Sequence, residues 1–153
     1  MPRINPPHTT STGAGATDWM GHLHQLERYV DRYLAAGLAQ AGHGQLKRAH
    51  LLLLRQLHGG VTSTELVHKL GITKQGISQL VQQLTAGGYV DAQPAKHDCR
   101  ANRLYVSERG EAGLAAADTL LHQLRHQFQT QLGCSSYALF ADQLAQLAQA
   151  TKQ

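Results

Sequence analysis

The sequence predicts a mainly α-helical fold that contains one small β-hairpin. Two observations lead to this prediction. Apolar residues recur at spacings of three and four along six separate segments, as they do on one face of an α-helix, and glycines or capping residues bound these segments. Between the fourth and fifth segments stand two short β-prone runs that flank a polar, partly basic stretch. The predicted order is therefore four helices, a hairpin and two further helices.

Length and composition indicate a single domain with an aliphatic core. The chain has 153 residues, of which 42% are hydrophobic and only 5% aromatic. These aliphatic residues fall in periodic segments, which excludes a disordered chain. The longest leucine run, Leu51–Leu54, is far below the roughly 20 apolar residues of a membrane span, and no basic-then-apolar leader opens the chain. We therefore expect a cytoplasmic protein that has no membrane partner.

Net charge and cysteine content narrow the possible functional classes of the protein only slightly. Lys and Arg number 14 against 10 Asp and Glu, which gives a formal net charge of +4. This charge suits a polyanion as partner, although many unrelated domains carry as much. Cys99 and Cys134 are too few and too far apart for a disulfide framework or a Cys-only zinc site. We expect no cofactor.

The first part of the chain predicts an arm and two helices. Residues 1–16 hold three of the four prolines together with Ser, Thr and Gly, and are expected to form a flexible arm. Asp18 suits the N-cap of a helix within residues 17–44. A second helix is expected over about residues 45–58. Its four consecutive leucines cover more than one face, so we expect it to be buried centrally.

The next two helices are short and closely linked. Thr62 and Glu65 have the spacing of a capping box, and Gly71 suits a left-handed helix exit. Thr73 then caps another helix, which ends at Gly87-Gly88. Two short helices joined by so tight a turn predict a helix-turn-helix.

A hairpin and two helices complete the predicted fold. Residues 89–93 and 103–106 are β-prone, and residues 94–102 between them are expected to form a long polar tip, or wing. Ser107 suits the cap of a long helix that ends at Gly133, and a last helix begins near residue 135. The predicted architecture is a winged helix-turn-helix core over residues 45–106, with dimerisation helices over 17–44 and 107–153.

The polar side of the helix after Thr73 predicts contact with DNA. No acidic residue occurs from Ile72 to Tyr89. Glutamine and serine side chains both donate and accept hydrogen bonds, as reading base edges requires, whereas lysine contacts phosphate. An ordinary solvated face is the alternative, but the capped helix before it and the basic hairpin after it favour DNA. The candidate contacts here are Ser63, Thr73, Lys74, Gln75, Ser78, Gln79 and Gln82.

The wing supplies the second group of candidate DNA contacts. Lys96, Arg100 and Arg103 carry positive charge there, with His97 as a further cation at low pH. Arginine on a β-ribbon suits the minor groove, whose negative potential attracts guanidinium. Asp98 is expected to organise the wing, by orienting Arg100 or by accepting backbone amides in the turn.

Two stretches of the sequence resemble the MarR family of regulators. Residues 98–110 are similar to that family's wing and following helix start, which favour Asp-x-Arg at the tip and a glycine after the strand; Val106-Ser107 stands where Leu-Thr is usual. Residues 64–73 and 84–90 resemble its helix-turn-helix. The resemblance implies that Arg100 enters the minor groove with Asp98 as its partner, and that residues 73–84 read the major groove. It also implies a homodimer held by the first, fifth and sixth helices, and usually repression that a small ligand or oxidant relieves.

The stimulus has three candidates. A phenolic or other aromatic acid is the common effector in that family. The residues we expect to line its pocket are Trp19, Tyr29, Tyr33, Arg48 and His50, with His24 beside them. Cys99 lies next to cations, which favours a reactive thiol, although an inert turn residue is the preferred interpretation. His122 and His126 share a helix face and His50 is a third candidate zinc ligand, but solvated or satisfied histidines are commoner. Cys134 is expected to be structural.

Other classes of function fit the sequence less well. The chain has no Gly-rich phosphate loop, nucleophile elbow or metalloprotease motif, so we expect no enzyme. A winged helix that binds a partner protein is the remaining alternative. Salt separates the two possibilities, because binding to DNA weakens steeply as salt rises.

The apolar stripes at both ends of the chain need a partner surface, which predicts a dimer. A twofold dimer would select a pseudo-palindromic DNA site.

Overall fold

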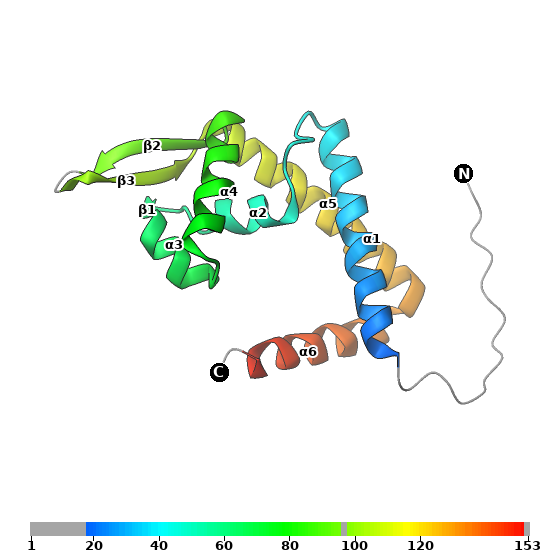
Figure 1. The fold of residues 1–153 in the computed structure, drawn as a ribbon. Coiled ribbons are helices and arrows are strands. Elements are labelled where there is room, and N and C mark those ends of the chain that lie inside the picture. Colours follow the sequence, from blue (N-terminus) through cyan, green and yellow to red (C-terminus); the bar gives the residue numbers. More distant parts are fainter. Residues whose placement is uncertain (1–17, 96–97, 152–153) are drawn as a thin grey trace.

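The computed structural model describes residues 18–95 and 98–151 (Figure 1). Its elements, in chain order, are α1 (Trp19–Gln40), α2 (Arg48–Leu54), β1 (Val61–Thr62), α3 (Ser63–Leu70), α4 (Lys74–Ala86), β2 (Val90–Ala95), β3 (Asp98–Val106), α5 (Glu108–Leu132) and α6 (Cys134–Ala150). This confirms the predicted order of helices and hairpin and adds the short strand β1. The arm expected over residues 1–16 lies outside the described residues.

The three strands form one antiparallel sheet in the order β1-β3-β2. The prediction of a long tip over residues 94–102 is wrong, because β2 and β3 continue into it and Pro94 pairs with Asn102. Proline lacks the N–H that an interior strand needs, but β2 is an edge strand and tolerates it. Residues 91–94 are all exposed, so this part of the ribbon has no buried face to produce the alternation by which strands are recognised.

Helix α2 is shorter than the predicted residues 45–58. The ring of His50 accepts the backbone N–H of Lys47 at 3.1 Å, which fixes the start of the helix at Arg48. At the other end, the amides of Gln56 and Leu57 bond to carbonyls three residues back, so the chain tightens and leaves the α-helix. Burial is also incomplete, because Leu52 is 51% exposed whereas the other three leucines of the run are buried.

A single hydrophobic core joins the helix-turn-helix to the two long helices. Tyr89 is the largest fully buried side chain in it. Two glycines of α5 allow this packing: a Cβ at Gly113 would lie 2.6 Å from Leu46, and one at Gly110 would strike the carbonyl oxygen of Tyr89. The other core residues are Leu34, Leu38, Leu46, Leu51, Leu53, Leu54, Leu57, Val61, Leu66, Ile77, Leu84, Val90, Leu104, Leu114 and Ala117.

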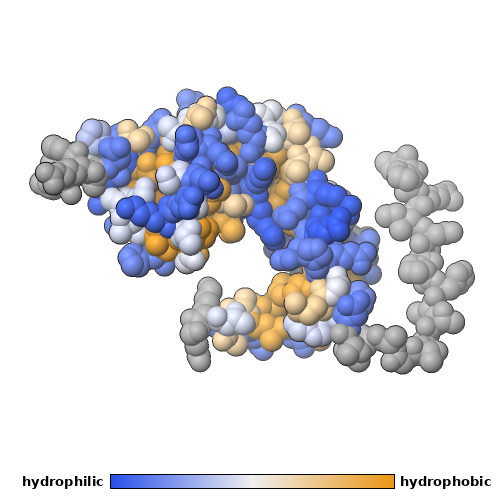
Figure 2. Space-filling view, viewed as in Figure 1, coloured by the Kyte–Doolittle hydropathy of each residue, from blue (hydrophilic) through white to orange (hydrophobic). Residues whose placement is uncertain are grey.

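The two long helices lead away from the sheet. Helices α1 and α5 lie side by side, and α6 turns back from the end of α5 and lies apart from α3 and α4 (Figure 1). No residue of α6 is buried, and hydrophobic residues gather over it in the space-filling view (Figure 2). None of the helices within the described ranges has the length and apolar character that crossing a membrane requires.

Candidate nucleic-acid interface

Helix α4 is held by caps at the turn that precedes it. Gly71 ends α3 with φ of 64°, a left-handed conformation that glycine adopts without a steric penalty. The side chain of Thr73 then accepts the backbone N–H of Gly76 at 3.2 Å and starts α4. Ile77 and Leu84 are buried on the inner side of the helix. These contacts confirm the predicted helix-turn-helix and determine which side of α4 faces outward.

The outward side of α4 carries the predicted DNA contacts of this helix. All six of its polar side chains from the first turn to the third are exposed: Lys74, Gln75, Ser78, Gln79, Gln82 and Gln83. Thr73 and Ser63, at the starts of α4 and α3, are exposed as well. The side therefore presents amides, a hydroxyl and one ammonium group, with no carboxylate on its own helix.

Gly76 serves the protein's own packing. A glycine on a helix can let another molecule approach closely, because it has no side chain. The structure shows a nearer cause, because a Cβ here would lie 2.8 Å from Cγ2 of Ile72 and 3.3 Å from Oγ1 of Thr73. The missing side chain lets the turn between α3 and α4 close over the first turn of α4.

The capping box at the start of α3 is complete. The backbone N–H and the hydroxyl of Thr62 donate to the carboxylate of Glu65 at 2.7 and 3.0 Å, and the Thr62 hydroxyl accepts the backbone N–H of Glu65 at 3.3 Å. The bond from the Thr62 backbone, followed by that from its hydroxyl, lowers the pKa of the Glu65 carboxyl below its ordinary value of 4.5. Glu65 is the last acidic residue before the turn in the sequence, and its carboxylate is engaged in the cap.

The wing has its own anchor in Arg103. This residue lies on the central strand β3, is half-buried, and donates from Nη1 to the carbonyl oxygen of Gly60 at 2.9 Å. Part of its guanidinium is therefore used inside the domain. The wing-tip predictions concern Lys96, His97, Asp98, Cys99 and Arg100, whose side chains lie outside the described residues; they stay predictions.

A buried histidine links α2 to α4. His50 is only 4% exposed, and its Nε2 lies 2.8 Å from Oε1 of Gln83. The sequence placed His50 among effector or zinc ligands, and no spacing rule connects two residues 33 positions apart. The hydrogen bond between His50 and Gln83 could therefore not be predicted from the sequence.

A family comparison agrees with this geometry. Residues 45–101, which run from just before α2 into β3, match the model of the MarR family. This segment of the chain is therefore similar to the MarR family. The match confirms the resemblance seen in the helix-turn-helix and wing sequences. No curated protein sequence matches the chain.

Solved MarR-type structures share the whole fold. A crystal structure of MarR is 17% identical with a TM-score of 0.74, and the alignment covers 92% of this chain and 95% of that one. The transcriptional repressor CouR, bound to a 23-mer DNA duplex, is 23% identical with a TM-score of 0.71 over 92% and 99%. A MarR mutant from E. coli complexed with operator DNA is 18% identical with a TM-score of 0.70 over 86% and 94%. At identities this low, the TM-scores and coverage show that the chain shares the fold of these proteins.

The five residues expected to form one effector pocket do not meet in this MarR-type fold. Tyr29, Arg48 and His50 each line a different pocket, and Trp19 is 61% exposed at the start of α1. Tyr33 instead donates to Gln123 across the α1–α5 contact at 3.3 Å. The prediction failed because Trp19 and Tyr33 are separated by about 21 Å along one helix, at 1.5 Å per residue.

Arg48 is engaged within the protein. Its guanidinium forms ion pairs with Asp31 at 3.1 Å and with Glu27 at 3.8 Å, both on α1. These pairs hold the start of α2 against α1, where the dimerisation helices of the prediction meet the winged helix. A carboxylate effector that binds Arg48 would have to displace the carboxylates of Asp31 and Glu27.

The candidate zinc ligands, for which solvated or satisfied histidines were the preferred interpretation, do not assemble within the part of the chain that the structure describes. No three His, Cys, Asp or Glu side chains gather there into a group able to hold a metal ion. His122 and His126 are exposed on α5, whereas His50 is buried and bonded to Gln83. Cys134 is an exposed free thiol at the start of α6, and its predicted structural role stays a prediction.

Proposed function

We propose that this chain is a sequence-specific DNA-binding transcriptional regulator, a repressor that acts as a homodimer on a pseudo-palindromic operator. The observation that carries the proposal is the outward side of α4. Exposed side chains of Gln75, Gln79 and Gln82 succeed one another there at spacings of three and four, on a helix with no acidic residue. Such amides form paired hydrogen bonds with base edges in the major groove, adenine above all.

The proposed DNA contacts divide into two kinds. Gln79 is exposed, central on α4 and uncharged, so it suits contact with bases. Lys74 and the start of α4 near Thr73 suit phosphate, because a cation and free backbone amides meet there. On the wing we propose that Arg100 enters the minor groove, with Lys96 and Arg103 beside it and Asp98 organising the tip.

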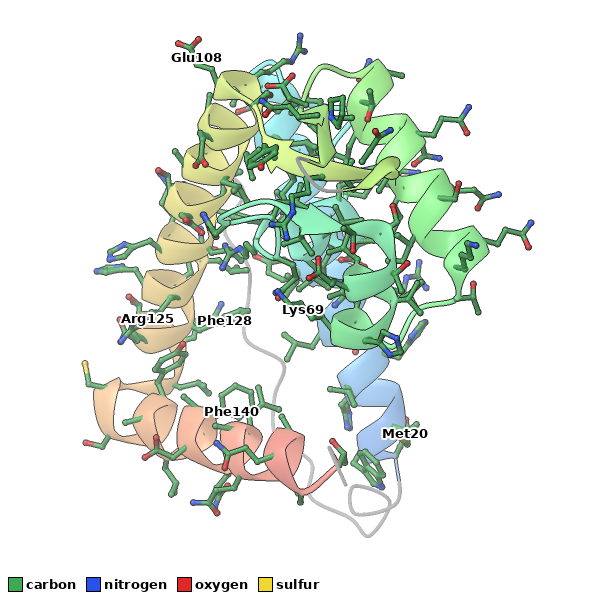
Figure 3. The ribbon with its side chains drawn as sticks, turned by 90° about the vertical axis from the view of Figure 1, so that its left-hand side faces the viewer. Met20, Lys69, Glu108, Arg125, Phe128 and Phe140 are labelled. Carbon is green, nitrogen blue, oxygen red and sulfur yellow. The ribbon has the colours of Figure 1, made fainter. Side chains whose placement is uncertain are left out.

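The proposed dimer uses the end of the molecule opposite the wing. Large apolar side chains are exposed there on all three long helices. Phe128 near the end of α5, Phe140 on α6 and Met20 at the start of α1 gather at this end (Figure 3). A helix as apolar as α6 is unstable in water without a partner surface. The exposed apolar residues of this end are Trp19, Met20, Leu23, Tyr29, Leu132, Leu139, Phe140, Leu144 and Leu147.

We propose a small aromatic acid as the effector that releases DNA. A pocket of about 370 Å³ between α1 and α5 supports this class of ligand, because it offers aromatic walls at Tyr29 and Phe128 and a cation at Arg32. Of the five residues first expected to bind the effector, it retains only Tyr29. A single-ring carboxylate such as benzoate suits these walls and this charge.

The test of DNA recognition is a binding isotherm on two duplexes. The purified chain is titrated by fluorescence anisotropy against its own upstream DNA and against a scrambled duplex of equal length and composition, over a range of salt concentrations. We expect tighter binding to the upstream duplex, and a steep loss of affinity for both duplexes as salt rises. Equal binding to the two duplexes, or binding that salt does not weaken, contradicts the proposal. Benzoate is then added to the specific complex, with benzamide as the uncharged control.

A further inference from the structure

His50 is unusual for its burial. Within the described ranges it is the one polar side chain in the buried class, at 4% exposure. A polar group in such a place requires hydrogen-bond partners, since burial without them is costly. His50 has a partner for each ring nitrogen, and these partners lie on different elements of the domain.

The two hydrogen bonds fix the tautomer of the ring. The backbone N–H of Lys47 can only donate, so Nδ1 of His50, 3.1 Å away, carries the lone pair. In the neutral ring the proton is then on Nε2, which donates to Oε1 of Gln83 at 2.8 Å. Rotating the ring would place carbon atoms against both partners. The orientation of the imidazole is therefore determined from both sides.

The bond reaches the proposed reading surface. Gln83 follows Gln79 by four positions, so the two side chains are neighbours on α4. Because Oε1 of Gln83 accepts from His50, the amide of Gln83 is held in one orientation with its N–H groups directed elsewhere. The bond also ties the third turn of α4 to α2, three of whose leucines are buried in the core.

Rotation of α4 about its axis is the movement that this bond opposes. Ile77 and Leu84 hold the inner side of the helix by apolar contact, which has no directional preference. A hydrogen bond is directional and weakens steeply when misaligned. Since base readout by Gln79 requires placement within about 0.5 Å, a small rotation of α4 would lose it.

We propose that His50 is a positioning residue for DNA recognition, which acts through Gln83 to hold α4 in its reading orientation. This inference rests on the proposed function. His50 itself is buried and contacts no base. Its contribution is to the preference for the operator over other DNA, and the general attraction to phosphate is independent of it.

The test is a double-mutant cycle on DNA affinity. The full chain is compared with His50→Leu, Gln83→Ala, the double variant, and His50→Gln, whose amide can accept from Lys47 and still donate to Gln83. Dissociation constants are measured for the upstream duplex and the scrambled duplex at one salt concentration. Thermal melts and circular dichroism check that each variant folds. Gln123→Ala serves as the matched control, because it removes another hydrogen bond between two helices, that with Tyr33.

His50→Leu and Gln83→Ala are each expected to weaken binding to the upstream duplex about five- to tenfold, with binding to the scrambled duplex within about twofold. The double variant should be no weaker than the weaker single variant, because both remove one link. His50→Gln should stay within about twofold of the natural chain, and Gln123→Ala should leave the preference unchanged. A merely structural bond would lower the melting temperature without altering the ratio of the two affinities.

Three results overturn the inference. They are an unchanged affinity ratio in Gln83→Ala, strictly additive effects in the double variant, and an imidazole ¹⁵N spectrum of the free protein that shows the proton on Nδ1 of His50. If His50→Leu fails to fold, Gln83→Ala and His50→Gln still decide the question. If the natural chain shows no preference between the duplexes, the proposed function and this inference are both wrong. If the natural chain shows the preference and the variants keep it, only this inference is wrong.

Discussion

Arg103 on the central strand of the wing donates a hydrogen bond to the carbonyl oxygen of Gly60, 43 residues earlier, at 2.9 Å. The bond joins the base of the wing to the turn before β1. Beside it, Thr62 of β1 pairs with Arg103 in the sheet. The wing is thereby attached to the domain by both side chain and backbone, which limits how far it can move relative to α4.

Arg103 is expected to contribute to stability as well as to charge. Replacing it by methionine keeps the aliphatic stem but leaves the carbonyl of Gly60 without its charged donor. We expect a loss of about 1.5–3 kcal/mol in the free energy of unfolding, the usual value for a hydrogen bond to a charged group. Urea denaturation at neutral pH measures it. Lys69→Met, an exposed cation on α3, is the control, and equal stability of the two variants contradicts the role given to Arg103.

The capping box gives the stability of the domain a defined dependence on pH. Because folding lowers the pKa of Glu65, the stabilisation is fully present above its ordinary value of 4.5 and is lost as pH falls through the lower value of the folded state. Glu65→Gln, which cannot titrate, should therefore show a shallower loss of stability between about pH 5 and pH 3. Melting temperatures across that range measure the difference. Parallel curves for the two proteins would show that Glu65 is not responsible.

Substitutions of Tyr89 can separate the contribution of its ring to stability from that of its hydroxyl. The side chain is 1% exposed, its ring lies 5.0 Å from the guanidinium carbon of Arg109, and its hydroxyl has no hydrogen-bond partner among the described residues. Tyr89→Phe should therefore be neutral, or more stable by up to about 1 kcal/mol, whereas Tyr89→Ala should cost about 3–5 kcal/mol. Denaturant midpoints compare the two. A Tyr89→Phe variant as unstable as Tyr89→Ala would show that the hydroxyl is satisfied.

The apolar side of α6 predicts the oligomeric state. Leu144 is 46% exposed there, beside other large apolar residues of this helix. Leu144→Glu should convert the proposed dimer into a monomer and weaken binding to the upstream duplex at least tenfold, because one chain contacts only a half-site. Light scattering after gel filtration gives the mass. Gln143→Glu adds the same charge one position away, and a monomer from both variants, or from neither, contradicts a role for this side of α6.

Much of the fold was predictable because its signals are local. Thr62, Thr73 and Ser107 each cap a helix through an amide three residues later, so the residue types and their spacing disclose the helix starts. The polar side of α4 was readable for the same reason, since Ile77 and Leu84 disclose the buried side by their spacing.

What the sequence could not predict depends on contacts between distant segments. The short strand β1 exists because Val61 pairs with Leu104, and the bond between His50 and Gln83 joins separate helices. The single effector pocket failed for a related reason, because residue chemistry alone does not say that Arg48 is paired with Asp31. Chemistry and periodicity predict which residues are polar and exposed, but only the packed chain shows which of them meet.

The proposed recognition of DNA depends most on base contacts made by the amides of α4. The direct measurement compares the natural chain with Gln79→Ala on the upstream and scrambled duplexes at one salt concentration. We expect the preference for the upstream duplex to fall about tenfold while binding to the scrambled duplex stays within about twofold, since a paired hydrogen bond to a base is lost and the phosphate contacts remain. An unchanged preference, or an equal loss on both duplexes, would contradict the assignment of α4 as the reading helix.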